Sequence, residues 1–111
     1  MTKKQRKQCE KIIESLMARL RMGAFLVNKY YVSDFYDQIT IDLIIFLAKV
    51  FNKDITEENA FYIVNEILKI NYYKLYKEFI LYQAHNEESV IKMGWDIANY
   101  FDKEEENENN K

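Results

Sequence analysis

A chain of 111 residues has room for one domain with a single hydrophobic core, and not for a second independent one. Hydrophobic residues make up 49% of the chain, a share that argues against a wholly disordered protein. The net charge of −2 combines a basic beginning with an acidic end, so the two ends carry opposite sign.

The composition favours helices over strands. Proline is absent and only two glycines occur, whereas sheets with tight hairpins depend on such residues in their turns. We therefore predict an all-α fold, a compact bundle of about five helices formed by residues 1–101. Residues 102–111 contain no apolar side chain, and we predict that they form a disordered acidic tail.

The cellular setting follows from what the sequence lacks. A single cysteine, Cys9, cannot form an internal disulfide and fits a reducing compartment. No apolar run approaches the ~20 residues that a membrane-spanning helix needs, and the first residues show no cleavage site of a signal peptide. We expect a cytoplasmic protein with no membrane contact.

The first predicted helix begins near Lys4 and buries apolar residues that recur at helical spacing. Its apolar stripe consists of Cys9, Ile12, Ile13, Leu16, Met17 and Leu20. Gly23 can end this helix as a left-handed cap, or the helix can continue, because Ala24, Val27 and Tyr31 extend the stripe. We prefer a helix that runs to about Tyr31.

The second predicted helix is the centre of the fold. Ser33 is a good N-cap, and residues 39–51, ITIDLIIFLAKVF, are apolar on nearly every side. A helix of this kind is stable only when neighbours cover most of its circumference. We expect Phe46 to be buried with the rest, and the helix to end near Asn52.

Three further helix signals follow. Thr56 with Glu57 and Glu58 is a strong start for a helix that stops near Asn71. The apolar pattern resumes at Tyr72 and reaches about His85, in a helix that is either separate or continuous with the last. The final helix starts with a similar cap signature at residues 86–88, and its apolar face is formed by Val90, Ile91, Gly94, Ile97, Ala98 and Phe101.

One segment resembles a known family. Residues 46–68, FLAKVFNKDITEENAFYIVNEIL, are similar to the helix, acidic turn and helix unit of TerB-like helical domains. Asn52 and Lys53 stand where that unit usually has Asp-Gly, and no functional residue is carried over from the resemblance.

Motifs that support chemistry are missing from the sequence. His85 is the only histidine, and neither a metal-binding histidine motif nor a glycine-rich phosphate loop occurs. Cys9 fits a buried apolar position better than a nucleophile, and Asp34 with Asp37 reads as surface charge. We therefore predict a non-enzymatic protein with no cofactor, no metal and no catalytic residue.

Binding to another protein is the function that these observations favour. Aromatic residues exceed what a small core readily hides, and exposed tyrosine or tryptophan often marks a binding surface. The predicted protein-binding residues are Tyr72, Tyr73, Lys77, Tyr82 and Trp95. We expect an inhibitor, adaptor or complex subunit, and the short chain rich in Tyr, Lys, Asn and Ile suits a phage or mobile-element accessory factor.

The alternative function is nucleic-acid binding by a basic first helix together with the Tyr/Lys helix. It requires the cationic residues of both helices to lie on one face, where they would contact phosphates. These residues are Lys3, Lys4, Arg6, Lys7, Arg21, Lys74 and Lys77. Two further alternatives are a homodimer formed through the tyrosine-rich face, and an acidic tail that masks the basic end.

Overall fold

The structure, a computed structural model, describes residues 1–26, 32–82 and 87–109. These residues form five α-helices and one short π-helix, without any strand. The elements are α1 (Lys3–Leu26), α2 (Val32–Val50), α3 (Glu57–Tyr62), the π-helix η1 (Ile63–Ile67), α4 (Tyr72–Tyr82) and α5 (Glu87–Asn109). The predicted all-α class and the number of helices are confirmed.

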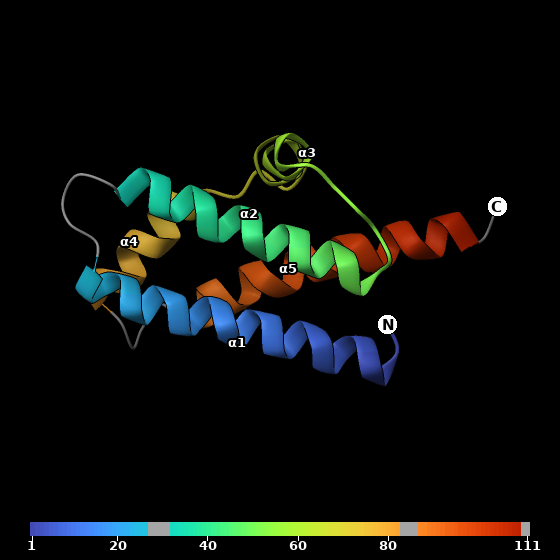
Figure 1. The fold of residues 1–111 in the computed structure, drawn as a ribbon, viewed down its shortest axis with the longest axis horizontal. Helices are drawn as coiled ribbons and strands as arrows, with labels where there is room; N and C mark the ends of the chain where they lie inside the picture. The colour runs from blue at the N-terminus through green and yellow to red at the C-terminus, as the bar shows by residue number, and fades with distance from the viewer. Residues whose placement is uncertain (27–31, 83–86, 110–111) are drawn as a thin grey trace.

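α2 is the central helix. Figure 1 shows α1 and α2 lying side by side in opposite directions, with α3 above α2 and α4 near the end where α1 finishes. α2 is in contact with each of the other four α-helices. None of the described helices is long and apolar enough to cross a membrane.

The apolar core is built around the middle of α2, as predicted. Its buried side chains include Tyr36, Ile39, Ile41, Leu43, Ile44, Leu47, Ala48 and Phe51. Thr40 is the one buried polar side chain of the described core. Its hydroxyl lies 2.7 Å from the carbonyl oxygen of Tyr36 and 2.8 Å from the hydroxyl of Tyr76. This pairing removes the cost of burying an unbonded hydroxyl.

Phe46 is the exception in this helix. We predicted that it is buried, but 50% of its side chain is exposed. Ser15 and Lys11, both polar, lie across from it on α1 and line the same surface hollow. α1 therefore covers Ile39 and Leu43 but leaves the Phe46 ring open to solvent.

α1 runs through Gly23 and ends at Leu26. The predicted continuation to Tyr31 falls on residues outside the described part of the chain. The apolar stripe of α1 is buried as expected except for Ile12, which is partly exposed, and Cys9 at its start is fully enclosed. Burial, with the nearby Asp102 and Glu10 carboxylates, raises the pKa of the Cys9 thiol to about 11.

The chain leaves α2 through a left-handed residue at the predicted end. Asn52 has a φ of 60°, and its N–H donates to the carbonyl of Lys49 at 3.0 Å. The next N–H, that of Lys53, reaches back to the carbonyl of Ala48, also at 3.0 Å. This pair of bonds is the Schellman arrangement, and asparagine tolerates the left-handed conformation better than most residues.

The helix that starts at Thr56 is shorter than predicted. The Thr56 hydroxyl accepts the N–H of Asn59 at 3.1 Å, as expected of an N-cap. α3 then gives way to η1, and Lys69 follows with a φ of 51°. The prediction that Asn71 stops this helix is wrong, because its side chain instead accepts the N–H of Lys74 at 3.2 Å and caps α4. α3 and α4 are therefore separate helices.

The predicted disordered tail is not confirmed, because α5 continues to Asn109. Acidic side chains of this extension contact other parts of the chain. Asp102 lies 3.1 Å from the amino group of Met1, Glu105 accepts from Gln5 at 3.2 Å, and Glu108 lies 2.8 Å from the Lys53 amine. Glutamate is also a good helix former, so the segment extends α5 without an apolar face of its own.

Gly94 lies where α5 packs tightly against α1. A Cβ atom at this position would lie 2.7 Å from Cγ1 of the buried Ile13 side chain. Isoleucine is stiff at χ1 and has little room to turn away.

We expect Gly94→Ala to destabilise the protein although alanine is the better helix former. Overpacking costs ~1–3 kcal/mol, against a helix-propensity gain of ~1 kcal/mol. Urea unfolding followed by circular dichroism should show a net loss of up to about 2 kcal/mol. In an Ile13→Ala background the same change should be neutral or stabilising, and equal losses in both backgrounds would refute the proposed contact.

Candidate protein-binding groove

The tyrosines of α4 mostly face the core. Tyr72 is only 3% exposed, so its predicted place on an exposed binding surface is wrong. Its ring centroid lies 4.7 Å from that of Tyr73 and 5.9 Å from that of Tyr76, and its hydroxyl donates to Asp37 on α2. The sequence does not reveal this partner, because Asp37 lies 35 residues away.

The other predicted protein-binding residues of α4 differ from Tyr72 in their exposure to solvent. Tyr73 keeps 39% of its side chain exposed, although its hydroxyl also donates to Asp37. Lys77 is exposed, while the side chain of Tyr82 lies outside the described part of the structure. The predicted α4 surface therefore reduces to Tyr73 and Lys77, and the described tyrosines serve mainly to hold α4 against α2.

Trp95 is half-buried between α1 and α5. It lines a shallow hollow together with Ile13, Met17 and Ile91, at whose edge Arg21 forms an ion pair with Glu87. Its indole therefore contributes to helix packing and presents only part of its surface.

The cationic residues that the nucleic-acid alternative groups together lie at opposite ends of α1. The basic end, defined as Lys3, Lys4, Arg6 and Lys7, occupies the first two turns of α1. Figure 1 shows α4, which carries Lys74 and Lys77, beside the opposite end of α1. At a rise of ~1.5 Å per residue, Lys7 and Arg21 are separated by roughly 20 Å.

The acidic extension of α5 does not neutralise the basic end. Within the described chain, the four cationic side chains of that end form no ion pair, and all are exposed. The extension bonds instead to the amino group of Met1, to Gln5 and to Lys53.

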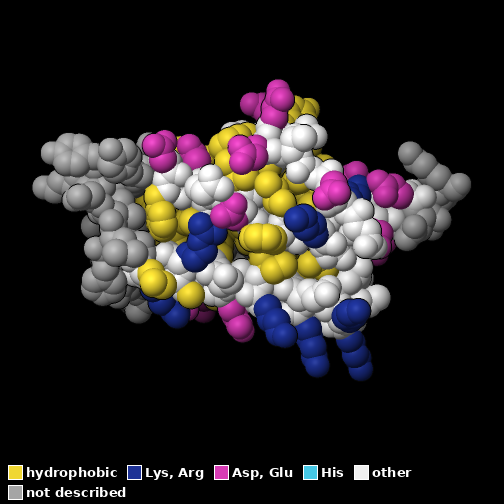
Figure 2. Space-filling model, in the orientation of Figure 1, with side chains coloured by type: hydrophobic (Ala, Val, Ile, Leu, Met, Phe, Trp, Pro, Cys, Tyr) yellow, Lys and Arg dark blue, Asp and Glu magenta, His cyan; other side chains and the backbone are white. Residues whose placement is uncertain are grey.

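An open hollow with a largely apolar lining lies between α1 and α2. Figure 2 shows hydrophobic side chains gathered in the middle of this face, with Lys and Arg side chains around them and below. The hollow has a volume of about 180 Å³. We define the α1–α2 groove by the residues that line it: Lys11, Ile12, Ser15, Leu16 and Arg19 from α1, and Ile39, Asp42, Leu43 and Phe46 from α2.

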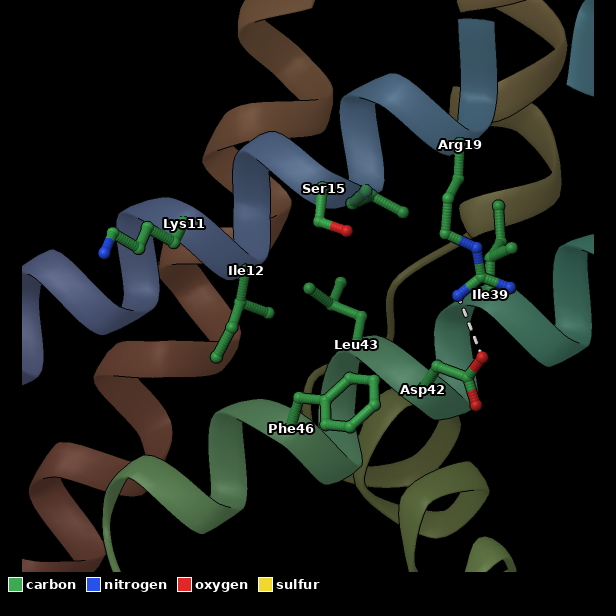
Figure 3. Close-up of a pocket in the computed structure, with 9 residues that line it drawn as sticks. Lys11, Ile12, Ser15, Arg19, Ile39, Asp42, Leu43 and Phe46 are labelled. Carbon is green, nitrogen blue, oxygen red and sulfur yellow. Dashed lines mark hydrogen bonds and ion pairs between the residues drawn. The ribbon is translucent and has the colours of Figure 1, made fainter. Parts of the chain in front are cut away.

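The floor of the groove is apolar and its rim is polar. Figure 3 shows Ile12, Leu43 and Phe46 around the hollow, with Lys11 at one end and the Arg19–Asp42 pair at the other. Arg19 Nη1 lies 2.8 Å from Asp42 Oδ2, and Gln38 donates to the second carboxylate oxygen at 2.9 Å. This network ties α1 to α2 and closes one end of the groove.

Lys49 lies next to Phe46 on α2, three residues further along the helix. Its amine lies 5.9 Å from the centroid of the Phe46 ring, within the range of a cation–π contact. Lys49 and Lys11 are both exposed. One positive charge, that of Lys49, therefore lies beside the half-exposed ring, while Lys11 stands further along the α1 wall with its amine directed away from the hollow (Figure 3).

The residues that line the groove are mainly apolar, with a few polar and charged side chains at the rim. Ser15 provides the groove's only hydroxyl, and no histidine or cysteine lines it. Among the described residues, no group of three or more His, Cys, Asp or Glu side chains is placed to hold a metal ion. An apolar floor with a charged rim is the composition of small protein-interaction sites.

No protein-family model matches this chain, and comparison with curated proteins and with solved structures finds no significant match. The function is therefore argued from the surface that the fold presents.

The buried tyrosines predict a distinct response to alkaline pH. Burial raises the pKa of Tyr36, Tyr72 and Tyr76 above the ordinary value of 10, and for Tyr72 the Asp37 carboxylate adds to the effect. Unfolded chains release these protons first, so the stability that these groups contribute is complete below about pH 9 and is lost as pH rises further.

We expect the free energy of unfolding to fall steadily above pH 9, by up to about 1.4 kcal/mol per pH unit for each such group. Urea titrations between pH 7 and pH 11 measure this slope. Tyr72→Phe should lower the free energy of unfolding at pH 7. It should also make the loss of stability above pH 9 less steep, because it removes one hydroxyl whose pKa is raised in the folded state. A slope unchanged by Tyr72→Phe would contradict the assignment.

Proposed function

We propose that this protein is a non-enzymatic binding module that acts by docking another protein into the α1–α2 groove, as an inhibitor, adaptor or complex subunit. The observation that supports the proposal most directly is the 50% exposure of Phe46 above an apolar hollow. A large aromatic ring left at the mouth of a pocket is typical of the anchor points at which binding energy concentrates.

Two further features support this site over the one predicted from sequence. The Arg19–Asp42 pair and the burial of Ile39 and Leu43 hold both walls of the groove in fixed positions. A preformed site loses less conformational entropy when a partner binds. Of the residues predicted to form the α4 surface, Tyr73 and Lys77 are the ones that are exposed among the described side chains, since Tyr72 is used internally.

We expect Phe46→Ala to reduce recovery of the partner at least tenfold when tagged protein is purified from its native host. Its thermal unfolding should change little, because half of the ring is already in solvent. The matched control is Tyr62→Ala, which removes a 58% exposed ring from α3. Tyr73→Ala and Trp95→Ala test the two other surfaces. Recovery that survives Phe46→Ala, or a tagged protein that captures no partner, would refute the proposal.

A photo-reactive phenylalanine analogue gives an independent readout. Placed at position 46, it should form a covalent adduct with the partner in the cell, whereas the same analogue at position 62 should not. Adducts only at position 62 would move the binding site to α3.

Nucleic-acid binding is a second candidate because the basic end is exposed and carries no ion pair within the described chain. This candidate predicts a mobility shift at low salt that weakens steeply as salt is raised. Substituting Lys3, Lys4, Arg6 and Lys7 by glutamine would abolish it. Our proposal predicts no shift at ~50 mM salt, and a shift that is lost in the glutamine variant would favour the nucleic-acid function instead.

A further inference from the structure

The shape of the α1–α2 groove restricts what can occupy it. Two antiparallel helices form its walls, and the described chain offers no strand edge beside it to which an extended peptide could add. An amphipathic helix lying along such a groove presents apolar side chains at intervals of three and four residues. The hollow of about 180 Å³ has room for one side chain of ring size, since a cavity of ~150 Å³ holds benzene.

The charged residues at the rim of the groove determine which charge a bound partner should carry. Arg19 and Asp42 neutralise each other, which leaves Lys11 and Lys49 as the uncompensated charges beside the hollow. Glu10 and Glu14, the acidic residues of this part of α1, lie on its other side, where they line the separate hollow that contains Trp95. The groove is therefore positive along one end and neutral at the other.

The positions of the two lysines also set a register. Lys49 follows Phe46 by about one helical turn on α2, with its amine beside the ring, and Lys11 stands at one end of the α1 wall with its amine directed away from the hollow (Figure 3). A carboxylate about one turn from the anchor of a bound helix, a distance of ~5.4 Å, would meet the Lys49 amine, and a carboxylate further along the same side of that helix would meet Lys11. Carboxylates at the Arg19–Asp42 end would meet no unpaired charge.

We propose that the partner docks an acidic amphipathic helix, with one apolar side chain in the hollow and Asp or Glu residues over Lys11 and Lys49. This inference rests on the proposed function and names the chemical class of its partner. Complementary charge contributes to specificity and association rate, while the buried anchor contributes most of the affinity.

The test is a selection from a displayed library of 16-residue helical peptides against the full chain. Enriched sequences should carry an apolar residue at helical spacing and at least two acidic residues on one side of it. A representative synthetic peptide should then bind Phe46→Ala at least tenfold more weakly than the parent chain.

Charge reversal separates this inference from the proposed function. The double variant Lys11→Glu with Lys49→Glu should weaken binding of the acidic peptide at least tenfold, and a peptide with its acidic residues replaced by lysine should regain affinity for that variant. The double variant Lys74→Glu with Lys77→Glu, an equal change of charge on α4, should have no effect. Binding that needs Phe46 but ignores both lysines would overturn the acidic-helix inference and leave the proposed function standing.

Two other outcomes would also overturn the inference. Enriched peptides that bind Phe46→Ala as well as the parent chain would show that the groove is not the docking site, which refutes the proposed function as well. A chain that is dimeric by light scattering, and monomeric after Phe46→Ala, would assign the groove to a second copy of the protein.

Discussion

The enclosure of α2 is the constraint on which the rest of the structure depends. Its apolar residues point in nearly all directions, so the chain must supply neighbours all round it, and α2 is indeed in contact with α1, α3, α4 and α5. Each contact fixes one other element in place. The close approach of α5 to α1 at Gly94 then completes the bundle, because it lets both helices reach the shared core.

Several of the aromatic residues that the sequence offers for binding are used to cover α2. Tyr36, Tyr72 and Tyr76 pack with ring centroids 5.0 to 5.9 Å apart, and the Tyr72 hydroxyl bonds to Asp37. The α4 helix is thus attached to α2 by rings and hydroxyls together. A composition rich in tyrosine therefore reflects internal packing in this protein as much as recognition.

The α1–α2 groove also results from the way the helices pack around the core. Lys11 and Ser15 stand on the α1 side of the groove and Phe46 on the α2 side, and no large apolar side chain of α1 covers the ring there. The ion pair of Arg19 with Asp42 fixes the spacing of the two helices at one end. A binding function through this groove would use a feature that arises from how two helices meet, and not from a motif in either one.

The sequence by itself determined the helical class, the central place of residues 39–51, the N-cap at Thr56 and the helix end near Asn52, because these depend on local propensity and apolar periodicity. The sequence also contains a signal for the exposure of Phe46 that our prediction did not use. Phe46 lies on the same side of α2 as three polar residues, Gln38, Asp42 and Lys49. Only the tertiary structure decided that Tyr72 is buried, that Asn71 caps the following helix, that α5 continues to Asn109, and that Phe46 is exposed. The burial of Tyr72 and the contacts of the α5 extension depend on partners far along the chain, and the exposure of Phe46 depends on the gap between two helices. The Asn71 cap is a local bond to Lys74, but asparagine suits the end of one helix as well as the start of the next, so the sequence alone does not choose between them.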